Sequence, residues 1–285
     1  MIKPFVSIMP REIITRIPVV GTICLRLSNS KKLYLKTNGH DGIAQDLYWW
    51  GIDAYESDTV KLFVKLLKYS NIVFDIGAST GIYSLIAAIY NPSGKVYAFE
   101  PLPISFNHLK KNININRLHN VHIDSGAVTN YNGDIKLYIP PGVIPLDSST
   151  LPGFRPVSEM ISVRALTIDS FVNENNIPKI DLIKIDTEGN EYMILKGAKD
   201  VLKRDKPMII CEVLKGRTES FLNSILEDMG YKFFWITSKG LIEKKVVESH
   251  RNRNCLLIKK EKMPEIMKAL ENNERLDGTD KKDGL

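Results

Sequence analysis

Residues 71–85 read NIVFDIGASTGIYSL, and this stretch decides the fold expected for the chain. The run Ile72–Ile76 is apolar and rich in β-branched residues, which is typical of a parallel strand buried on both faces. From Ile82 onward the apolar residues recur at helical spacing, and Ser79 or Thr80 stands at the N-cap position. The stretch therefore predicts a strand, a glycine turn and a helix, in that order.

The turn has the chemistry of a ligand site. Gly77, Ala78 and Gly81 leave its backbone open to close approach, and the N-terminus of the following helix attracts an anion. Asp75, at the end of the strand, would repel a pyrophosphate but attract an ammonium or sulfonium group. The turn therefore suits a ligand with both signs of charge, and S-adenosylmethionine, with a carboxylate and cationic groups, is such a ligand.

Other ligands suit this turn less well. Its glycine pattern is GxxxG rather than GxGxxG, and no Gly-Lys-Ser/Thr follows it. Both features disfavour a dinucleotide site and a P-loop. A strand-to-helix turn that binds no ligand is the remaining alternative.

The second predicted strand, Lys95–Phe99, ends at Glu100 and Pro101. In a Rossmann-like sheet an acidic side chain at this place binds the ribose hydroxyls, because a carboxylate accepts two hydrogen bonds at once. A third strand, Val121–Asp124, leads into small residues at 125–127, where an adenine ring could lie.

A dense polar cluster, DTEGNE at residues 186–191, follows the predicted buried strand Ile180–Ile185. In open α/β sheets, ligands bind beyond the carboxyl ends of the strands. We therefore expect Asp186 and Glu188 to lie in the same crevice as the acidic residues that end the first two strands.

A helix is predicted directly after this cluster, from Glu191 to Lys203. Acidic side chains stabilise a helix N-terminus, so capping of this helix is the alternative role for Glu188 and Glu191. A further strand, Met208–Val213, carries Glu212 near its carboxyl end.

The composition sets broad limits on function. The chain has 285 residues, of which 44% are hydrophobic, enough for one substantial core. Its formal net charge of +6 is spread along the sequence, so a nucleic-acid partner is permitted but not indicated. The three cysteines have no CxxC spacing, which predicts neither a disulfide framework nor a zinc site and favours a cytoplasmic location. The apolar segment Ile13–Leu27 is too short and too interrupted for a transmembrane span.

The chain divides into three predicted parts. Residues 1–56 form a small N-terminal cap with a strand at Leu33–Leu35 and an aromatic group that could close on the ligand. Residues 57–260 form the main domain, and residues 261–285 form a polar tail. The loop Pro140–Pro156, rich in proline, glycine and serine, is a candidate substrate lid. The aromatic group of the cap comprises Tyr48, Trp49, Trp50 and Tyr55.

Three motifs occur in a fixed order, VFDIGASTG, AFEPLP and KIDTEGNE. Together they resemble the FkbM family of class I S-adenosylmethionine-dependent methyltransferases, and the likeness runs from about Tyr55 to Leu256. The resemblance implies that residues 57–260 are a methyltransferase domain of the α/β, Rossmann-like class. It implies a mostly parallel seven-stranded sheet flanked by helices, with the last two strands forming an antiparallel hairpin.

The resemblance also implies methyl transfer to a hydroxyl group of a sugar, a glycan or a secondary metabolite, with S-adenosylmethionine as cofactor. Asp186 and Glu188 would lie close to the sulfonium and the incoming hydroxyl. The predicted cofactor-binding residues are Asp75, Gly77, Ala78, Gly81 and Asp186 towards the methionine end, Glu100 and Pro101 at the ribose, and Ser125 and Ala127 near the adenine.

A sugar hydroxyl is a poor nucleophile, so a base that takes its proton is expected to add roughly 10²–10⁴-fold to the rate. Asp186 or Glu188 is the candidate for this base. A second hypothesis, which is not favoured, makes Asp186, Glu188 and Glu212 ligands of a divalent cation such as Mg²⁺.

Two other classes of function stay open at this point. One is a nucleic-acid methyltransferase, which the lack of a concentrated Lys/Arg stripe disfavours. The other is a non-catalytic Rossmann-like binding module, which the intact acidic positions disfavour. The sequence selects neither the methyl acceptor nor the oligomeric state.

Overall fold

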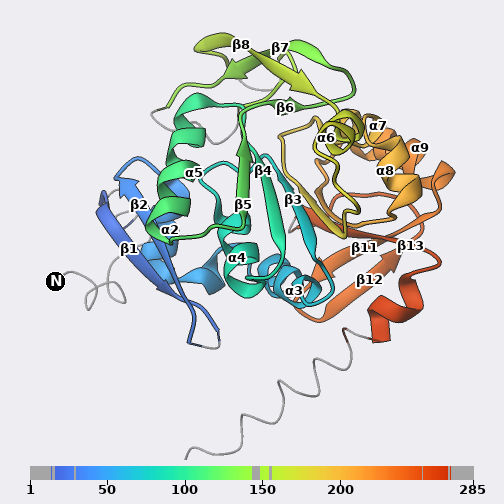
Figure 1. Ribbon diagram of the computed structural model, residues 1–285, viewed down its shortest axis with the longest axis horizontal. Coiled ribbons are helices and arrows are strands. Elements are labelled where there is room, and N and C mark those ends of the chain that lie inside the picture. Colours follow the sequence, from blue (N-terminus) through green and yellow to red (C-terminus); the bar gives the residue numbers. More distant parts are fainter. Residues whose placement is uncertain are drawn as a thin grey trace, which may run out of the picture.

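Eight strands form the central sheet. They are β3 (Ile72–Ile76), β4 (Lys95–Phe99), β5 (Val121–Asp124), β9 (Leu182–Ile185), β10 (Met208–Glu212), β11 (Tyr231–Thr237), β12 (Gly240–Lys244) and β13 (Asn254–Lys259). Their order in the sheet is β12-β11-β13-β10-β9-β3-β4-β5 (Figure 1). The computed structural model describes residue 14 and residues 17–28, 30–142, 148–153, 156–251, 253–268 and 270.

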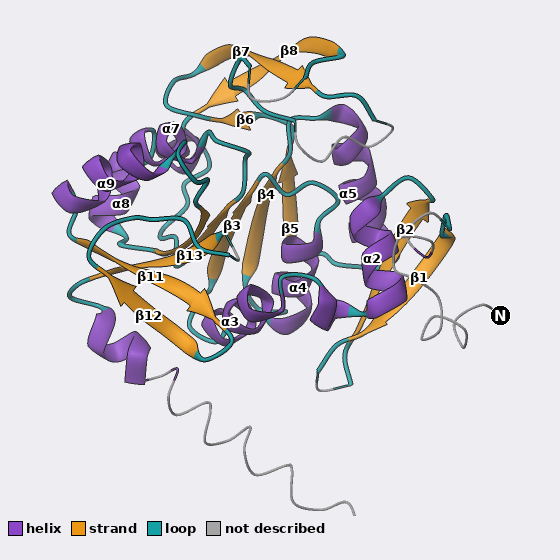
Figure 2. Cartoon of the chain, turned by 180° about the vertical axis from the view of Figure 1, so that it is seen from behind, coloured by secondary structure: helices purple, strands orange, loops and turns teal. Residues whose placement is uncertain are grey.

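The central strands are buried on both faces by two layers of helices (Figure 2). Alternate residues of one strand point to opposite faces, so Leu182 joins one hydrophobic cluster while Ile183 and Ile185 join the other. The first cluster includes residues of α3 (Ser57–Leu67), α4 (Ile82–Tyr90) and α5 (Pro103–Ile115). The second includes residues of α6 (Ile168–Glu174), α7 (Glu191–Lys196), α8 (Lys199–Arg204) and α9 (Glu219–Asp228).

This arrangement confirms the predicted α/β, Rossmann-like class and adds one strand to the predicted seven. β3, β4, β5, β9 and β10 are parallel, and β13, β11 and β12 extend the sheet in antiparallel pairs. The extra strand is β12, which forms a hairpin with β11 through a two-residue loop between Thr237 and Gly240. The last two of the seven predicted strands correspond to β11 and β13, and these pair antiparallel as the resemblance implied, with β13 between β10 and β11.

A second, three-stranded sheet lies beyond the carboxyl end of β5. It consists of β6 (Ala127–Val128), β7 (Gly133–Ile139) and β8 (Glu159–Leu166), in the order β6-β8-β7. The first six positions of β8 are exposed or half-buried, and only Ala165 and Leu166 at its end are buried. The candidate lid, Pro140–Pro156, joins these two strands, and residues 143–147 and 154–155 lie outside the described residues.

The N-terminal cap contains a hairpin of β1 (Val20–Arg26) and β2 (Lys32–Asn38), followed by α2 (Gly42–Trp50) and a short 3₁₀ helix, η2 (Ile52–Ala54). The sequence predicted the strand at Leu33–Leu35 but not β1 or α2. Side chains of the cap share the hydrophobic cluster that contains α4, among them Ile23, Leu25 and Leu35. The cap is therefore packed on the same core as the sheet.

Two asparagines of α5 fasten the cap to the sheet. Asn112 accepts a hydrogen bond from the Lys36 N–H at 2.8 Å, and Asn116 accepts one from the Tyr34 N–H at 2.8 Å. Asn116 also donates to the Tyr34 carbonyl at 2.6 Å, while Asn112 donates to the Thr80 carbonyl at 2.8 Å. Asn112 thus connects β2 to the glycine turn between β3 and α4.

Two predicted boundaries differ from the structure. The helix predicted over Glu191–Lys203 is divided into α7 and α8, because a Cβ at Gly197 would lie 2.2 Å from the Thr129 carbonyl oxygen and the chain packs closely there. The predicted polar tail begins later than residue 261, since residues 263–268 are helical and Ile266 and Leu270 are buried. Residues 271–285 lie outside the described residues.

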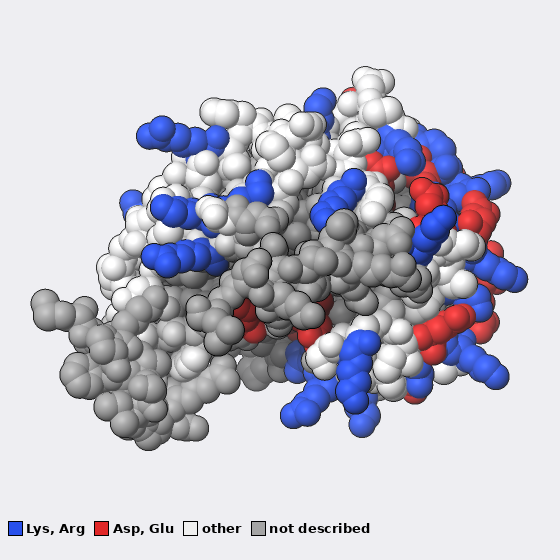
Figure 3. All heavy atoms as spheres, turned by 90° about the horizontal axis from the view of Figure 1, so that it is seen from below, with Lys and Arg blue, Asp and Glu red and all other residues white. Residues whose placement is uncertain are grey.

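On one face of the molecule, the charged side chains are spread over several groups (Figure 3). On the face seen from below, Lys and Arg side chains form separate groups, and acidic side chains lie between them on one side (Figure 3). In the described ranges, no helix combines the length and the apolarity needed to cross a membrane.

Candidate functional site

Two cavities meet at the carboxyl ends of the parallel strands. The Glu100 cavity is lined by Glu100, Pro101, Leu102, Gly126, Ala127, Ser148 and Thr150, among others. The Asp75 cavity, of about 270 Å³, is lined by Tyr55, Glu56, Asp75, Ala78, Thr80, Tyr83, Lys184, Glu212 and Arg253, among others. Gly77, Ser79, Asp186 and Glu188 line both cavities, so the two form one crevice.

The glycine turn allows the loops after β3 and β9 to touch. Gly77 has φ +80°, and a Cβ on it would lie 1.9 Å from the Asp186 carbonyl oxygen. Gly81 has φ +99°, and a Cβ on it would lie 2.5 Å from the Leu109 side chain. The N-cap of α4 is Gly81, not Ser79 or Thr80 as predicted, because the chain enters the helix through this left-handed residue.

Asp75 lies beneath the first turn of α4. Its carboxylate accepts a hydrogen bond from the Ser84 hydroxyl at 2.5 Å and another from the Ser84 backbone N–H. It therefore stabilises the helix N-terminus, which has no capping side chain at Gly81. Burial raises the pKa of Asp75 to about 6, although the Ser84 hydroxyl acts in the opposite direction.

Glu100 joins the turns that follow β3 and β4. One carboxylate oxygen accepts the Ser79 N–H at 2.7 Å and the other accepts the Leu102 N–H at 2.8 Å. The residue is 7% exposed, and burial raises the pKa of Glu100 to about 7 against the lowering effect of these two N–H groups. Each oxygen keeps acceptor capacity for a ligand in the Glu100 cavity.

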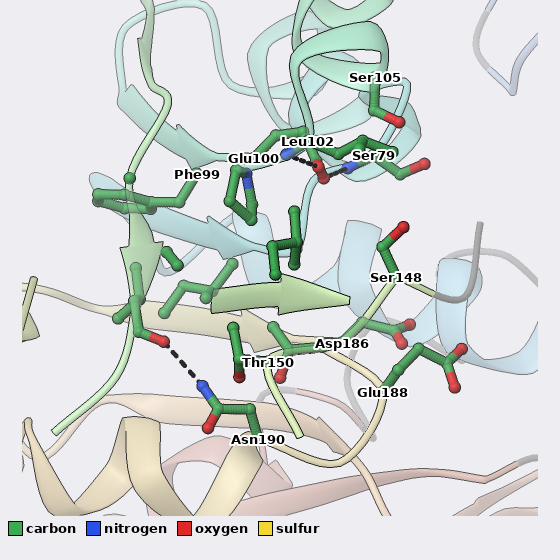
Figure 4. A pocket seen from close by; sticks show the side chains of 18 residues that line it. Ser79, Phe99, Glu100, Leu102, Ser105, Ser148, Thr150, Asp186, Glu188 and Asn190 are labelled. Atoms are coloured by element: carbon green, nitrogen blue, oxygen red, sulfur yellow. Dashed lines mark hydrogen bonds between the residues drawn. The ribbon is translucent and has the colours of Figure 1, made fainter. Parts of the chain in front are cut away.

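Gly126 and Ala127 line the Glu100 cavity, in which Figure 4 shows Glu100, Ser148 and Thr150. Ser125, predicted near an adenine ring, is exposed and is not part of the cavity wall; Gly126 occupies the expected place. Ser148 and Thr150, from the described part of the candidate lid, line the opposite side. The lid segment is held by the Ser149 hydroxyl, which donates to the Glu188 carbonyl at 2.9 Å.

A buried lysine stands behind Asp186, and the sequence reasoning did not identify it. Lys184 is fully buried, and its ammonium donates to Asp186 at 2.8 Å and to Asn254 at 2.9 Å. Burial alone would lower the pKa of Lys184, but the carboxylates of Asp186 and Glu56 outweigh it and raise the pKa. A charged residue inside an apolar strand, in the motif KID, was the signal that could have identified it.

The cap contributes to the site through Glu56 rather than through its tryptophans. Glu56 accepts a short hydrogen bond from the Tyr83 hydroxyl of α4, and both residues line the Asp75 cavity. The backbone of Glu56 has φ +42°, which is uncommon for a residue with a side chain. The cap was predicted to cover the ligand pocket. The cap residues that line the Asp75 cavity are Ile43, Tyr55 and Glu56.

The acidic residues after β9 have different surroundings. Glu191 is fully buried and accepts hydrogen bonds from the Thr187 hydroxyl and from the N–H groups of Thr187 and Gly189, each at 3.1 Å. Glu191 therefore stabilises the loop that leads into α7, which is a structural role like the helix capping considered for it. Asn190 is likewise engaged, since its amide donates to the Val128 carbonyl at 3.0 Å.

Asp186 and Glu188 face a third carboxylate, Glu212, at the end of β10. One oxygen from each of the three lies within 4.8 Å of the others. Burial raises the pKa of Glu212 to about 9, and the neighbouring charges of Asp186 and Glu188 add to this effect. The crevice thus has Glu100 at one end, Asp75 at the other and an acidic cluster where its two cavities join.

Several known proteins are similar to this chain in sequence. The profile of the family described as "Methyltransferase FkbM domain" matches residues 75–233. The 31-O-demethyl-FK506 methyltransferase FkbM of Streptomyces tacrolimicus is 26% identical over 166 residues, which are 47% of this chain and 62% of that protein. The hexuronic acid methyltransferase AglP of Haloferax volcanii is 25% identical over 175 residues, which are 61% of this chain and 68% of that protein.

Among solved structures, the methyltransferase FkbM of Methylobacillus flagellatus is similar at 17% identity and a TM-score of 0.46. The similarity covers 66% of this chain and 43% of that protein. The chain thus spans less than two thirds of the length of this protein and of the Streptomyces relative. Because the family profile matches more than half of the residues, the chain belongs to the FkbM methyltransferase family, as its three motifs predicted.

Proposed function

We propose that this chain transfers a methyl group from S-adenosylmethionine to a hydroxyl oxygen of a sugar, a glycan or a secondary metabolite. The relatives support the reaction class, since one is named for a substrate that lacks an O-methyl group and the other for a hexuronic acid. The net charge of +6 is spread along the sequence rather than gathered in a basic stripe, which favours this function over methylation of a nucleic acid.

The observation that carries the proposal is the continuity of the crevice. Glu100 has the position and the acceptor capacity to bind ribose hydroxyls, and Gly126 and Ala127 leave room for a flat ring beyond it. At the other end, the N-terminus of α4 suits a carboxylate and Asp75 suits an ammonium group. A nucleoside joined to an amino acid through a sulfonium fits this order of groups.

The same order brings the reacting groups to the junction of the two cavities. When bound, S-adenosylmethionine supplies a methyl group whose bond to sulfur breaks, with the electron pair left on sulfur, as a bond to the acceptor oxygen forms. The chain has to hold the acceptor in line with that bond, and such positioning can lower a barrier by on the order of 7–11 kcal/mol. Asp186 and Glu188 line the junction from which an acceptor would approach.

We assign Asp186 as the base that accepts the hydroxyl proton. The Lys184 ammonium donates a hydrogen bond to its carboxylate at 2.8 Å and fixes its orientation. Glu188, two residues later, sits on a backbone with φ +54° followed by Gly189 with φ +107°. Such strain is often retained at functional sites, and we assign Glu188 to the binding of the acceptor.

Calorimetric titration with S-adenosylmethionine and S-adenosylhomocysteine tests the cofactor site. We expect micromolar binding by the wild type and loss of binding in Glu100→Ala and Asp75→Ala. Because Asp75 also stabilises α4, Asp75→Asn serves as a milder variant, and circular dichroism checks that each variant is folded. Absence of binding to the folded wild type would contradict the proposed function.

A second assay identifies the acceptor. The protein is incubated with methyl-labelled S-adenosylmethionine and a panel of hexuronic acids, neutral glycosides and hydroxylated macrolides, and labelled product is sought. Transfer to oxygen in any of these classes supports the proposal. Transfer to RNA or DNA with none to these acceptors would favour the nucleic-acid alternative instead.

A further inference from the structure

We propose that Asp186, Glu188 and Glu212 form a binding site for one hard divalent cation at the junction of the two cavities. Oxygen ligands, and carboxylates above all, are what Mg²⁺, Mn²⁺ and Ca²⁺ prefer in proteins. The three residues come from the ends of two neighbouring parallel strands, β9 and β10, so the fold itself brings them together.

The spacing of the three carboxylates suits a single ion. One oxygen of each lies within 4.8 Å of the others. With metal–oxygen distances of about 2.0–2.6 Å, two ligands of the same ion lie about 3 Å apart when adjacent and about 4–5 Å apart when opposite. The partly exposed Glu188 side chain can rotate to shorten these distances, while Asp186 stays paired with Lys184. Figure 4 shows both carboxylates on the same side of the loop after β9.

Glu212 gives an independent indication that the cluster has a ligand. Its side chain is only 7% exposed, and its Oε2 is buried without a hydrogen-bond partner among the described residues. Its other oxygen lies 3.7 Å from the nearest Arg253 nitrogen, which is longer than a hydrogen bond. A buried carboxylate oxygen with no partner is costly, and a bound cation would remove that cost.

Two neighbouring cations limit the expected affinity. Lys184 already pairs with Asp186, and Arg253 lies near Glu212, so part of the negative charge of the cluster is offset. We therefore expect a dissociation constant of roughly 10⁻⁵–10⁻³ M, at the weak end of protein sites for such ions. Three protein ligands leave further coordination positions open to an acceptor.

The role of this cation rests on the proposed function, but its binding does not. An acceptor hydroxyl that occupies one of the open positions would lose its proton more readily, because the nearby positive charge lowers the pKa of a bound hydroxyl. The proton passes to a carboxylate oxygen of Asp186 while the acceptor oxygen forms its bond to the methyl carbon. The site thus selects acceptors with a second oxygen, as in a diol or a hydroxy acid, that can also bind the ion.

Binding of Mn²⁺, followed by electron paramagnetic resonance and by calorimetry, tests the site on the full chain without any acceptor. We expect one Mn²⁺ per chain, displaced by excess Mg²⁺, and binding at least tenfold weaker in Glu212→Gln and in Glu188→Gln. Glu227→Gln, on the exposed face of α9, removes the same charge away from the site and should leave the affinity unchanged.

The outcomes separate this inference from the proposed function. Two results overturn the cation site and leave the methyltransferase proposal intact. In the first, the protein binds S-adenosylhomocysteine but no Mn²⁺ at millimolar concentration. In the second, the wild type and Glu212→Gln bind Mn²⁺ with equal affinity. The opposite result is a protein that binds one Mn²⁺ per chain, more weakly in Glu212→Gln and Glu188→Gln, but binds no S-adenosylhomocysteine. This result supports the cation site and contradicts the proposed function.

Discussion

A Cβ atom on Gly77 would lie 1.9 Å from the carbonyl oxygen of Asp186. The glycine turn after β3 and the acidic loop after β9 are therefore in direct backbone contact, and the crevice exists only because one of the two has no side chain there. A change in the predicted cofactor loop at Gly77 therefore acts directly on the predicted catalytic loop at Asp186.

We expect Gly77→Ala to damage both stability and cofactor binding. The new methyl group would displace Asp186, so the affinity for S-adenosylmethionine should fall at least tenfold in calorimetry. Gly230→Ala is the matched control, because Gly230 has φ +64° but nothing within 4 Å of an added Cβ. It should lose about 1–2 kcal/mol of unfolding free energy from the left-handed backbone alone and keep its cofactor affinity. Equal affinity losses in both variants would show that contact with Asp186 is not the cause.

Glu100 should make the stability of the cofactor-free protein depend on pH. Burial raises the pKa of Glu100 in the folded protein to about 7, from an ordinary value of 4.5. A raised carboxyl pKa stabilises the fold below pH 4.5, and this stabilisation is lost as the pH rises through 7. Relative to Glu100→Gln, the wild type should lose up to about 3 kcal/mol of unfolding free energy between pH 4.5 and pH 8. Urea unfolding at several pH values measures this difference, and a constant offset between the two proteins would contradict it.

Replacement of the two carboxylates at the junction should separate chemistry from cofactor binding. Asp186→Asn, which removes the assigned base, should lower turnover roughly 10²–10⁴-fold while S-adenosylhomocysteine still binds. Glu188→Gln should mainly raise KM for the acceptor. Single-turnover transfer to whichever acceptor the panel identifies measures both effects. Near-wild-type turnover by both variants would exclude either carboxylate as the base.

Lys184→Met should destabilise the protein more than the loss of a surface ion pair. Removal of the buried ammonium leaves Asp186 and Asn254 without their partner. The cost should be roughly 1–3 kcal/mol, below that of a fully buried pair because the Asp186 side chain is 29% exposed. Lys179→Met is the control, since Lys179 pairs with Asp181 at 2.7 Å but is 56% exposed, and it should cost about 0–1 kcal/mol. Thermal unfolding of both variants decides whether burial makes the difference.

Strong local patterns carried most of the sequence prediction. β3, β4 and β5 were predicted with the bounds that the structure has, because buried parallel strands are short apolar runs ended by polar residues. The meeting of Asp75, Glu100, Asp186 and Glu188 in one crevice followed from the rule that parallel strands end at the same side of a sheet.

Features that depend on distant contacts were not predictable in this way. The break between α7 and α8 reflects the close approach of Thr129 to Gly197, two residues that are far apart in the sequence. The role of Glu56 depends on Tyr83, which lies in a different element, so this pair shows no local pattern. The hydrogen bonds of Asn112 and Asn116 with β2 likewise join residues that are far apart in the sequence.

These two asparagines have a consequence for how the protein behaves at high concentration. A two-stranded hairpin on the surface exposes unpaired backbone groups, which can recruit a strand from another molecule and start aggregation. Asn112 and Asn116 supply side-chain amides to the outer backbone groups of β2, in place of the strand that would otherwise pair there. α5 thus covers the outer edge of β2 at Tyr34 and Lys36, where a strand from another molecule would otherwise pair.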